Sequence, residues 1–125
     1  MATTVKQMLD AANAAVPRIS TAEAKDLMAK GNVLVVDVRD GAEVAKSGKV
    51  PGAVNVPRGL LEFRADPATP THDKNFDQGK TVIIYCASGG RSALGGKTLK
   101  DMGYAKVFNL GGFKDWVDGG GEVES

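Results

Sequence analysis

Hydrophobic residues recur along the chain with two different periods, and their alternation predicts the secondary structure. Two runs are continuously apolar and rich in β-branched residues, VLVVDVR at 33–39 and TVIIYC at 81–86. Such runs are typical of strands that are buried on both faces of a parallel sheet. Shorter apolar runs at 18–20, 54–56 and 106–110 predict three further strands.

Helical spacing of apolar residues appears between these runs. The segment 5–16 places Val, Met, Leu and Ala side chains on one face, and Pro17 ends that helix. Ser20 and Glu23 form a capping-box pattern that begins a second helix, for which Gly31 is the stop signal. Four further helices are predicted at 42–47, 58–66, 87–102 and 111–118.

Strands that alternate with helices predict an α/β fold, here with a central, mainly parallel five-stranded sheet flanked by helices on both faces. We expect one domain over residues 1–125, with the helix of 1–17 packed on it and a tail at 119–125. The segment 67–79 contains two prolines and little periodicity, so we expect a long loop. Loops of that length in compact domains are often functional, and this one is a candidate gate.

Composition and charge exclude several classes of protein. Sixteen basic and fifteen acidic residues leave a net charge of +1 without a basic stripe, so no nucleic-acid partner is expected. No apolar run is long enough to span a bilayer and the first residues lack a secretory signal, which predicts a cytoplasmic protein without a membrane partner. One cysteine and one histidine allow no internal disulfide and disfavour a metal site built from protein ligands.

The only cysteine, Cys86, stands at the carboxyl end of a predicted strand and directly before a predicted helix, in the sequence YCASGGRS. Ligands of parallel sheets bind at that end of the strands. Backbone amides that turn around the sulfur, together with the helix N-terminus, would form an anion cradle that favours the nucleophilic thiolate. The candidate cradle residues are Ala87, Ser88, Gly89, Gly90 and Arg91. Arg91 either binds an anionic substrate or points outward as a solvated residue. The ordinary alternative is a small buried cysteine that only fills space, which the strand end and the glycine pair disfavour.

Three segments, in this order, are similar to the signatures of the rhodanese domain family in its single-domain form. CASGGR resembles the six-residue active-site loop of that family, Cys-x-x-Gly-x-Arg. VLVVDVRDGAEVAKSGKVPGAVNVP resembles its upstream signature, an Asp-x-Arg followed by Glu and by Gly-x-x-Pro-Gly-Ala, and VFNLGGFKDW resembles its closing segment. The resemblance covers residues 18–123 and implies the rhodanese-like fold.

The resemblance also implies sulfur transfer. Cys86 would take the outer sulfur of a small anionic donor such as thiosulfate as a persulfide, and would pass it to a thiophilic acceptor such as cyanide, with no metal or organic cofactor. A second hypothesis is a persulfide carrier that delivers sulfur to a protein partner. A rhodanese-fold interaction module is disfavoured because such modules commonly lack the cysteine. The related phosphatases and arsenate reductases carry a Cys-x5-Arg loop, whereas four residues separate Cys86 from Arg91, which favours sulfur over phosphate.

For charged residues outside the loop, the sequence predicts roles less specifically. Arg58 follows the end of a predicted strand, so it either reaches the mouth of the site or pairs with Glu62, four residues further along a helix. Asp37 and Arg39 belong to the Asp-x-Arg signature, and we expect both to support the site from behind. Asp37 should accept hydrogen bonds from nearby backbone, and Arg39 should form an ion pair with Glu43.

Overall fold

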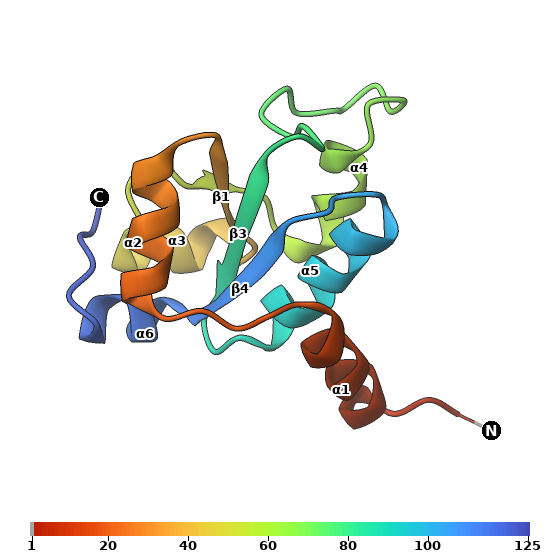
Figure 1. Cartoon of the computed structure of the whole chain (residues 1–125), viewed down its shortest axis with the longest axis horizontal. Coiled ribbons are helices and arrows are strands. Elements are labelled where there is room, and N and C mark those ends of the chain that lie inside the picture. Colours follow the sequence, from red (N-terminus) through yellow and green to blue (C-terminus); the bar gives the residue numbers. More distant parts are fainter. Residues whose placement is uncertain (1) are drawn as a thin grey trace.

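The structure is a computed structural model and describes residues 2–125. A parallel sheet with strand order β2-β1-β3-β4 lies between two layers of helices (Figure 1). The strands are β1 (Val33–Asp37), β2 (Val54–Asn55), β3 (Thr81–Cys86) and β4 (Val107–Gly112). The helices are α1 (Val5–Ala15), α2 (Thr21–Lys30), α3 (Gly41–Ser47), the 3-10 helix η1 (Arg58–Leu60), α4 (Leu61–Ala65), α5 (Gly90–Asp101) and α6 (Phe113–Asp118).

The sheet has four strands rather than the five that the sequence predicts. The segment 18–20 was expected to be the fifth strand, but it forms only one isolated parallel bridge, between Arg18 and Asn109. Pro17 lies on one side of this bridge, and on the other Ser20 already caps α2. The chain therefore turns into a helix before a second pair of residues can join the sheet.

Alternate residues of the buried strands enter two separate cores. Val82 and Ile84 of β3 belong to a cluster that includes Leu61 of α4 and Leu99 of α5. The intervening side chains of β3 enter the opposite cluster, where they meet α2 and α6. Because the side-chain period of a strand is two, one apolar strand supplies both cores, which confirms the prediction of a sheet covered on both faces (Figure 1).

The predicted limits of α2 are confirmed in atomic detail. The Ser20 hydroxyl accepts from the Glu23 N–H at 3.1 Å, and the Glu23 carboxylate accepts from the Ser20 N–H at 3.0 Å. Gly31 ends the helix with a φ of 79°, a conformation that glycine adopts without strain. These caps fix where the chain leaves its bridge with β4.

Two segments without helices or strands are nevertheless fixed in place. Phe76, in the predicted loop 67–79, is buried and meets the edge of the Tyr104 ring with centroids 6.4 Å apart. In the tail, Glu124 exchanges two backbone hydrogen bonds with Lys49, and the Glu122 carbonyl accepts from the Trp116 indole at 2.7 Å. No helix within residues 2–125 is both long and apolar enough to cross a membrane.

Candidate active site

Cys86 is the last residue of β3, and the loop after it turns directly into α5. The cysteine is 1% exposed, and the Gly89 N–H donates to its sulfur at a distance of 3.0 Å. Gly89 is the N-cap of α5 and has a φ of 103°, a left-handed conformation that glycine adopts most readily. This one residue therefore bends the loop back so that its amide points at the sulfur.

Opposing effects act on the cysteine thiol. Burial raises the pKa of Cys86, but hydrogen bonds from the Ser92 hydroxyl and from the backbone N–H groups of Ser92, Gly89 and Ser88 outweigh it, so the net pKa is lowered. A lowered pKa increases the thiolate fraction, and the thiolate is the nucleophile. Of the predicted cradle, the amides of Ser88 and Gly89 act on the sulfur in this structure, and Ser92 joins them from the first turn of α5.

Ser92 and Asn109 are site residues that the sequence analysis missed. Both are completely buried, and the Ser92 Oγ lies 3.4 Å from the Cys86 sulfur and 2.8 Å from the Asn109 Oδ1. The available signal was a polar residue in an otherwise apolar strand, because Asn109 interrupts the run VFNL. Beside it, the pairing of β3 with β4 changes register, a β-bulge of the kind that often occurs next to active sites.

Arg91 forms a two-point ion pair with Glu43 of α3. Its two terminal nitrogens donate to the two carboxylate oxygens at 2.8 and 3.0 Å. Hydrogen bonds from Arg91 and from the Asp40 backbone lower the pKa of Glu43 to about 2, and the Glu43 carboxylate raises the pKa of Arg91. The pair joins α3 to the beginning of α5 and places a positive charge near Cys86.

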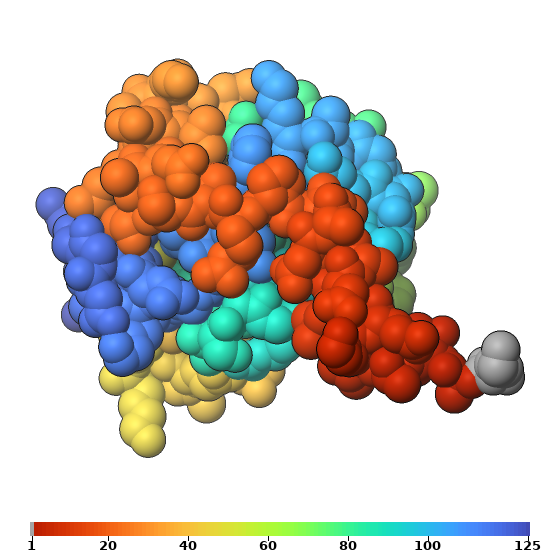
Figure 2. All heavy atoms as spheres, turned by 60° about the horizontal axis from the view of Figure 1, so that its bottom comes forward, coloured from red at the N-terminus to blue at the C-terminus, as the bar shows by residue number. Residues whose placement is uncertain are grey.

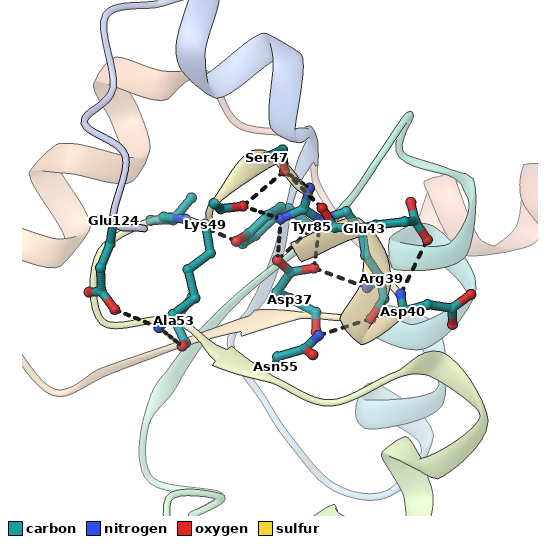
Figure 3. Close-up of polar contacts among 12 residues, drawn as sticks. Asp37, Arg39, Asp40, Glu43, Ser47, Lys49, Ala53, Asn55, Tyr85 and Glu124 are labelled. Carbon is teal, nitrogen blue, oxygen red and sulfur yellow. Dashed lines mark hydrogen bonds and ion pairs between the residues drawn. The ribbon is translucent and has the colours of Figure 1, made fainter. Parts of the chain in front are cut away.

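The predicted ion pair between Arg39 and Glu43 is wrong, because Arg39 turns into the protein. Its guanidinium donates to the buried Asp37 carboxylate, with a shortest distance of 2.7 Å, and also to the Ser47 hydroxyl and the Gly48 carbonyl (Figure 3). Burial opposes the charge on Arg39, but the Asp37 carboxylate outweighs it and raises the pKa of Arg39.

The expected backbone hydrogen bond to Asp37 is confirmed, with Arg39 N–H as the donor at 3.0 Å. The guanidinium also lies 4.5 Å from the centre of the Phe113 ring of α6, a cation–π contact. Asp37 and Arg39 therefore hold together β1, the segment after α3, and α6. Both residues lie on the face of the sheet that carries Tyr85 and Phe113.

Arg58 has the second of its two predicted arrangements. Its guanidinium donates to Glu62 at 2.8 Å and to the Thr98 hydroxyl of α5 at 3.0 Å. The structure thus joins Arg58 to α4 and to the second half of α5, rather than to the cysteine loop.

The remaining side of the loop is covered by β4 and by Arg18. A methyl group on Gly112 would lie 2.4 Å from the Ala87 carbonyl oxygen, so the two backbones are in direct contact. The half-exposed Arg18 side chain packs against Gly111 and Gly89, and its guanidinium lies 3.8 Å from the Asp115 carboxylate. In Figure 2 the teal segment that includes the loop lies at the surface between α6 (blue) and α1 (red).

The sequence that forms this site is similar to that of known proteins. A family model described as the rhodanese-like domain matches residues 20–118. The chain belongs to the rhodanese-like domain family. The family resemblance expected from the three sequence segments is thereby confirmed.

Individual relatives of this rhodanese-like domain are similar over most of the chain. A sulfurtransferase of Allochromatium vinosum is 37% identical over 87 residues, which are 69% of this chain and 73% of the relative. The thiosulfate sulfurtransferase PspE of Escherichia coli is 40% identical over 80 residues, 64% of this chain and 70% of the relative.

Among solved structures, a protein of unknown function from Rhodopseudomonas palustris, described as a possible tyrosine phosphatase, has the same fold. Its TM-score is 0.90 at 40% identity, and the match covers 99% of this chain and 96% of that one.

Proposed function

We propose that this rhodanese-like domain is a thiosulfate sulfurtransferase that carries the transferred sulfur as a persulfide on Cys86. The observation that carries the proposal is the Gly89 N–H directed at a buried cysteine sulfur from 3.0 Å, in a loop where hydrogen bonds lower the pKa of that thiol. The sulfurtransferase names of two relatives support the same chemistry.

The reaction needs two displacement steps. The Cys86 thiolate attacks the outer sulfur of thiosulfate, a new S–S bond forms, and sulfite leaves with the electron pair of the old S–S bond. The acceptor, cyanide or a thiolate, then attacks the outer sulfur of the persulfide, and the Cys86 thiolate leaves. Both steps keep negative charge beside the same amides, which act as a preorganised field. The acceptor is a small thiophile or the thiol of a protein partner.

The geometry also bears on the phosphatase alternative. Each terminal nitrogen of Arg91 donates one hydrogen bond to Glu43, which holds the guanidinium toward α3. Four residues, not five, separate Cys86 from Arg91. This shorter spacing favours a ring that accommodates one sulfur atom over one that accommodates a tetrahedral anion. We therefore propose that Arg91 holds the loop and adds positive charge near the thiolate.

Mass spectrometry of the intact protein tests the proposal. After incubation with thiosulfate, the chain should gain the mass of one sulfur atom, and subsequent cyanide should remove it and release thiocyanate. Cys86→Ser should do neither, and because Cys86 is the only cysteine, no other thiol can carry the sulfur. Failure to gain sulfur from thiosulfate would overturn the proposal.

Two further results would replace the proposed function with a different one. Loading from a different sulfur donor, without turnover by small acceptors, would identify a persulfide carrier for a protein partner. Hydrolysis of an aryl phosphate that is lost in Cys86→Ser would identify a phosphatase. The spacing of the loop disfavours the second result.

A further inference from the structure

The Asn109 side chain is completely buried behind the cysteine loop and contacts it from two directions. Its Oδ1 accepts from the Gly111 N–H at 2.9 Å and lies 2.8 Å from the Ser92 Oγ. Its Nδ2 donates to the Gly89 carbonyl at 3.2 Å. Because a backbone N–H can only donate, the amide atom that faces Gly111 must be the oxygen, which fixes the orientation of the side chain.

These contacts restrict where the single hydroxyl proton of Ser92 can go. The Gly89 carbonyl already accepts from the Ala93 N–H at 3.0 Å and from Asn109, so both of its lone pairs are used. The Ser92 Oγ lies 3.2 Å from that carbonyl but finds no free lone pair there. Two acceptors remain, the Asn109 Oδ1 at 2.8 Å and the Cys86 sulfur at 3.4 Å.

We propose that Asn109 is a positioning residue that allows the Ser92 hydroxyl to change its hydrogen-bond partner when Cys86 ionises. With a neutral thiol, Ser92 donates to Asn109 and the thiol donates to Ser92. With a thiolate, the hydroxyl turns and donates to the sulfur. Asn109 then keeps its bond from Gly111, and Gly89 keeps both of its donors. Neither state leaves a buried polar group without a partner, so turning the hydroxyl leaves no desolvation penalty.

The inference rests on the proposed function in one respect only, that Cys86 reacts as a thiolate. Four charged groups surround the same loop in two pairs, Arg91 with Glu43 and Arg18 with Asp115. All four remain in the variants used below, so their field is common to every protein compared.

The test measures how fast iodoacetamide alkylates Cys86 as a function of pH in Asn109→Ala, Ser92→Ala and the double variant. Without Asn109, the Gly89 carbonyl has a free lone pair and takes the Ser92 proton, so the sulfur loses a donor. Each single variant should react about tenfold more slowly at about pH 7, because a hydrogen bond to a charged group is lost, and its pH midpoint should move upward. The double variant should be no slower than Ser92→Ala. Unchanged alkylation in Asn109→Ala, or two independent losses that multiply, would overturn the inference.

Val107→Ala is the matched control, because Val107 is a buried apolar residue of the same strand. It should lower stability without moving the alkylation midpoint. If Asn109→Ala does not fold, the wild-type protein gives the answer by NMR. The side-chain amide signals of Asn109 should titrate with the same midpoint as Cys86 alkylation and should not titrate in Cys86→Ser; signals that stay flat in the wild type would contradict the role of Asn109.

Neither measurement uses a sulfur donor. A failure of thiosulfate loading therefore overturns the proposed function, whereas a failure of the alkylation pattern overturns the role of Asn109.

Discussion

At the scale of single residues, the reactivity of Cys86 depends on a balance between burial and hydrogen bonding. Moving a charged group out of water costs several kcal/mol, and each hydrogen bond to a charged atom contributes about 1.5–3 kcal/mol. The sulfur is almost completely buried, yet the hydroxyl of Ser92 and several amides together outweigh that cost and lower the pKa of the thiol. The number of donors, rather than any one of them, lowers the pKa of this thiol.

The ion pair between Arg91 and Glu43 predicts a dependence of stability on pH. The pKa of Glu43 falls from 4.5 to about 2 in the folded protein, so the pair stabilises the fold above about pH 4.5 and loses its effect as the pH falls toward 2. Both side chains are more than one third exposed, which limits the contribution to no more than about 1 kcal/mol. In urea unfolding across this window, Glu43→Gln should lose less stability on acidification than the wild type.

Arg91→Gln is the control for that measurement. Arg91→Gln removes the pair but leaves Glu43 with its hydrogen bond from the Asp40 N–H, so it should flatten the pH dependence in the same direction by a smaller amount, and the double variant should be no flatter than Glu43→Gln. A wild-type-like slope in Glu43→Gln would show that the pair contributes no stability.

The sequence could predict those site residues whose pattern lies within a few neighbouring positions of the chain. Cys86 and Gly89 were predicted because strand end, glycine and helix start follow one another in the chain. The partner of Arg91 was not, since Glu43 lies 48 residues earlier and meets Arg91 only in the folded chain. Arg39 was assigned to Glu43 because the two are four residues apart, but the buried Asp37 carboxylate binds it instead.

At the scale of elements, the apolar pattern predicted the strands that form the sheet, because strands buried on both faces must be continuously apolar. It also predicted a strand at 18–20, where the residues are suitable but their neighbours are not: a proline and a helix cap leave space for one bridge only. Hydropathy reports burial, and it contains no information on how many consecutive hydrogen bonds a short segment can form. The hydropathy pattern likewise did not predict the bulge of β4 at the site.

The contact between β4 and the cysteine loop is tight enough to predict the effect of a single methyl group. Gly112→Ala would place its Cβ 2.4 Å from the Ala87 carbonyl oxygen, and the backbone must move to relieve this overlap. The φ of Gly112 is −97°, so the effect is one of space and not of backbone strain. We expect a loss of about 1–3 kcal/mol in unfolding free energy and slower alkylation of Cys86.

Gly59→Ala is the matched control, since a Cβ there meets nothing within 4 Å. It should leave both the unfolding free energy and the alkylation rate close to those of the wild type. If Gly112→Ala behaved in the same way, the loop and β4 could not be in the close contact described here.

At the scale of the whole molecule, the candidate site and the buried ion pair that stabilises the sheet lie on opposite faces of the sheet. The cysteine, Ser92 and Asn109 lie between β3, β4 and α5, while the buried pair of Asp37 and Arg39 fastens the other face of the sheet. The end of the chain contributes to that support. Glu124 pairs with Lys49 through backbone hydrogen bonds of 2.9 and 2.8 Å, next to the Gly48 carbonyl that accepts from Arg39.

Removal of residues 121–125 tests whether this tail is part of the folded domain. The deletion removes both backbone bonds to Lys49, the bond from Gly52 N–H to the Glu124 carboxylate, and the acceptor of the Trp116 indole. Each hydrogen bond contributes about 0.5–1.5 kcal/mol, and part of this is offset by the entropy of ordering the tail, so we expect a loss of about 2 kcal/mol in urea unfolding. Glu124→Gln keeps the backbone bonds and an acceptor for Gly52 and removes only the surface ion pair with Lys49, so it should change stability by less than about 1 kcal/mol. Alkylation of Cys86 should remain at the wild-type rate in both variants, because none of the lost contacts involves the cysteine loop.

Equal stability of the truncated and full chains would show that the tail contributes nothing to the stability of the domain. A large loss of alkylation in the truncated chain would show that the contacts of the tail affect the cysteine loop through the sheet.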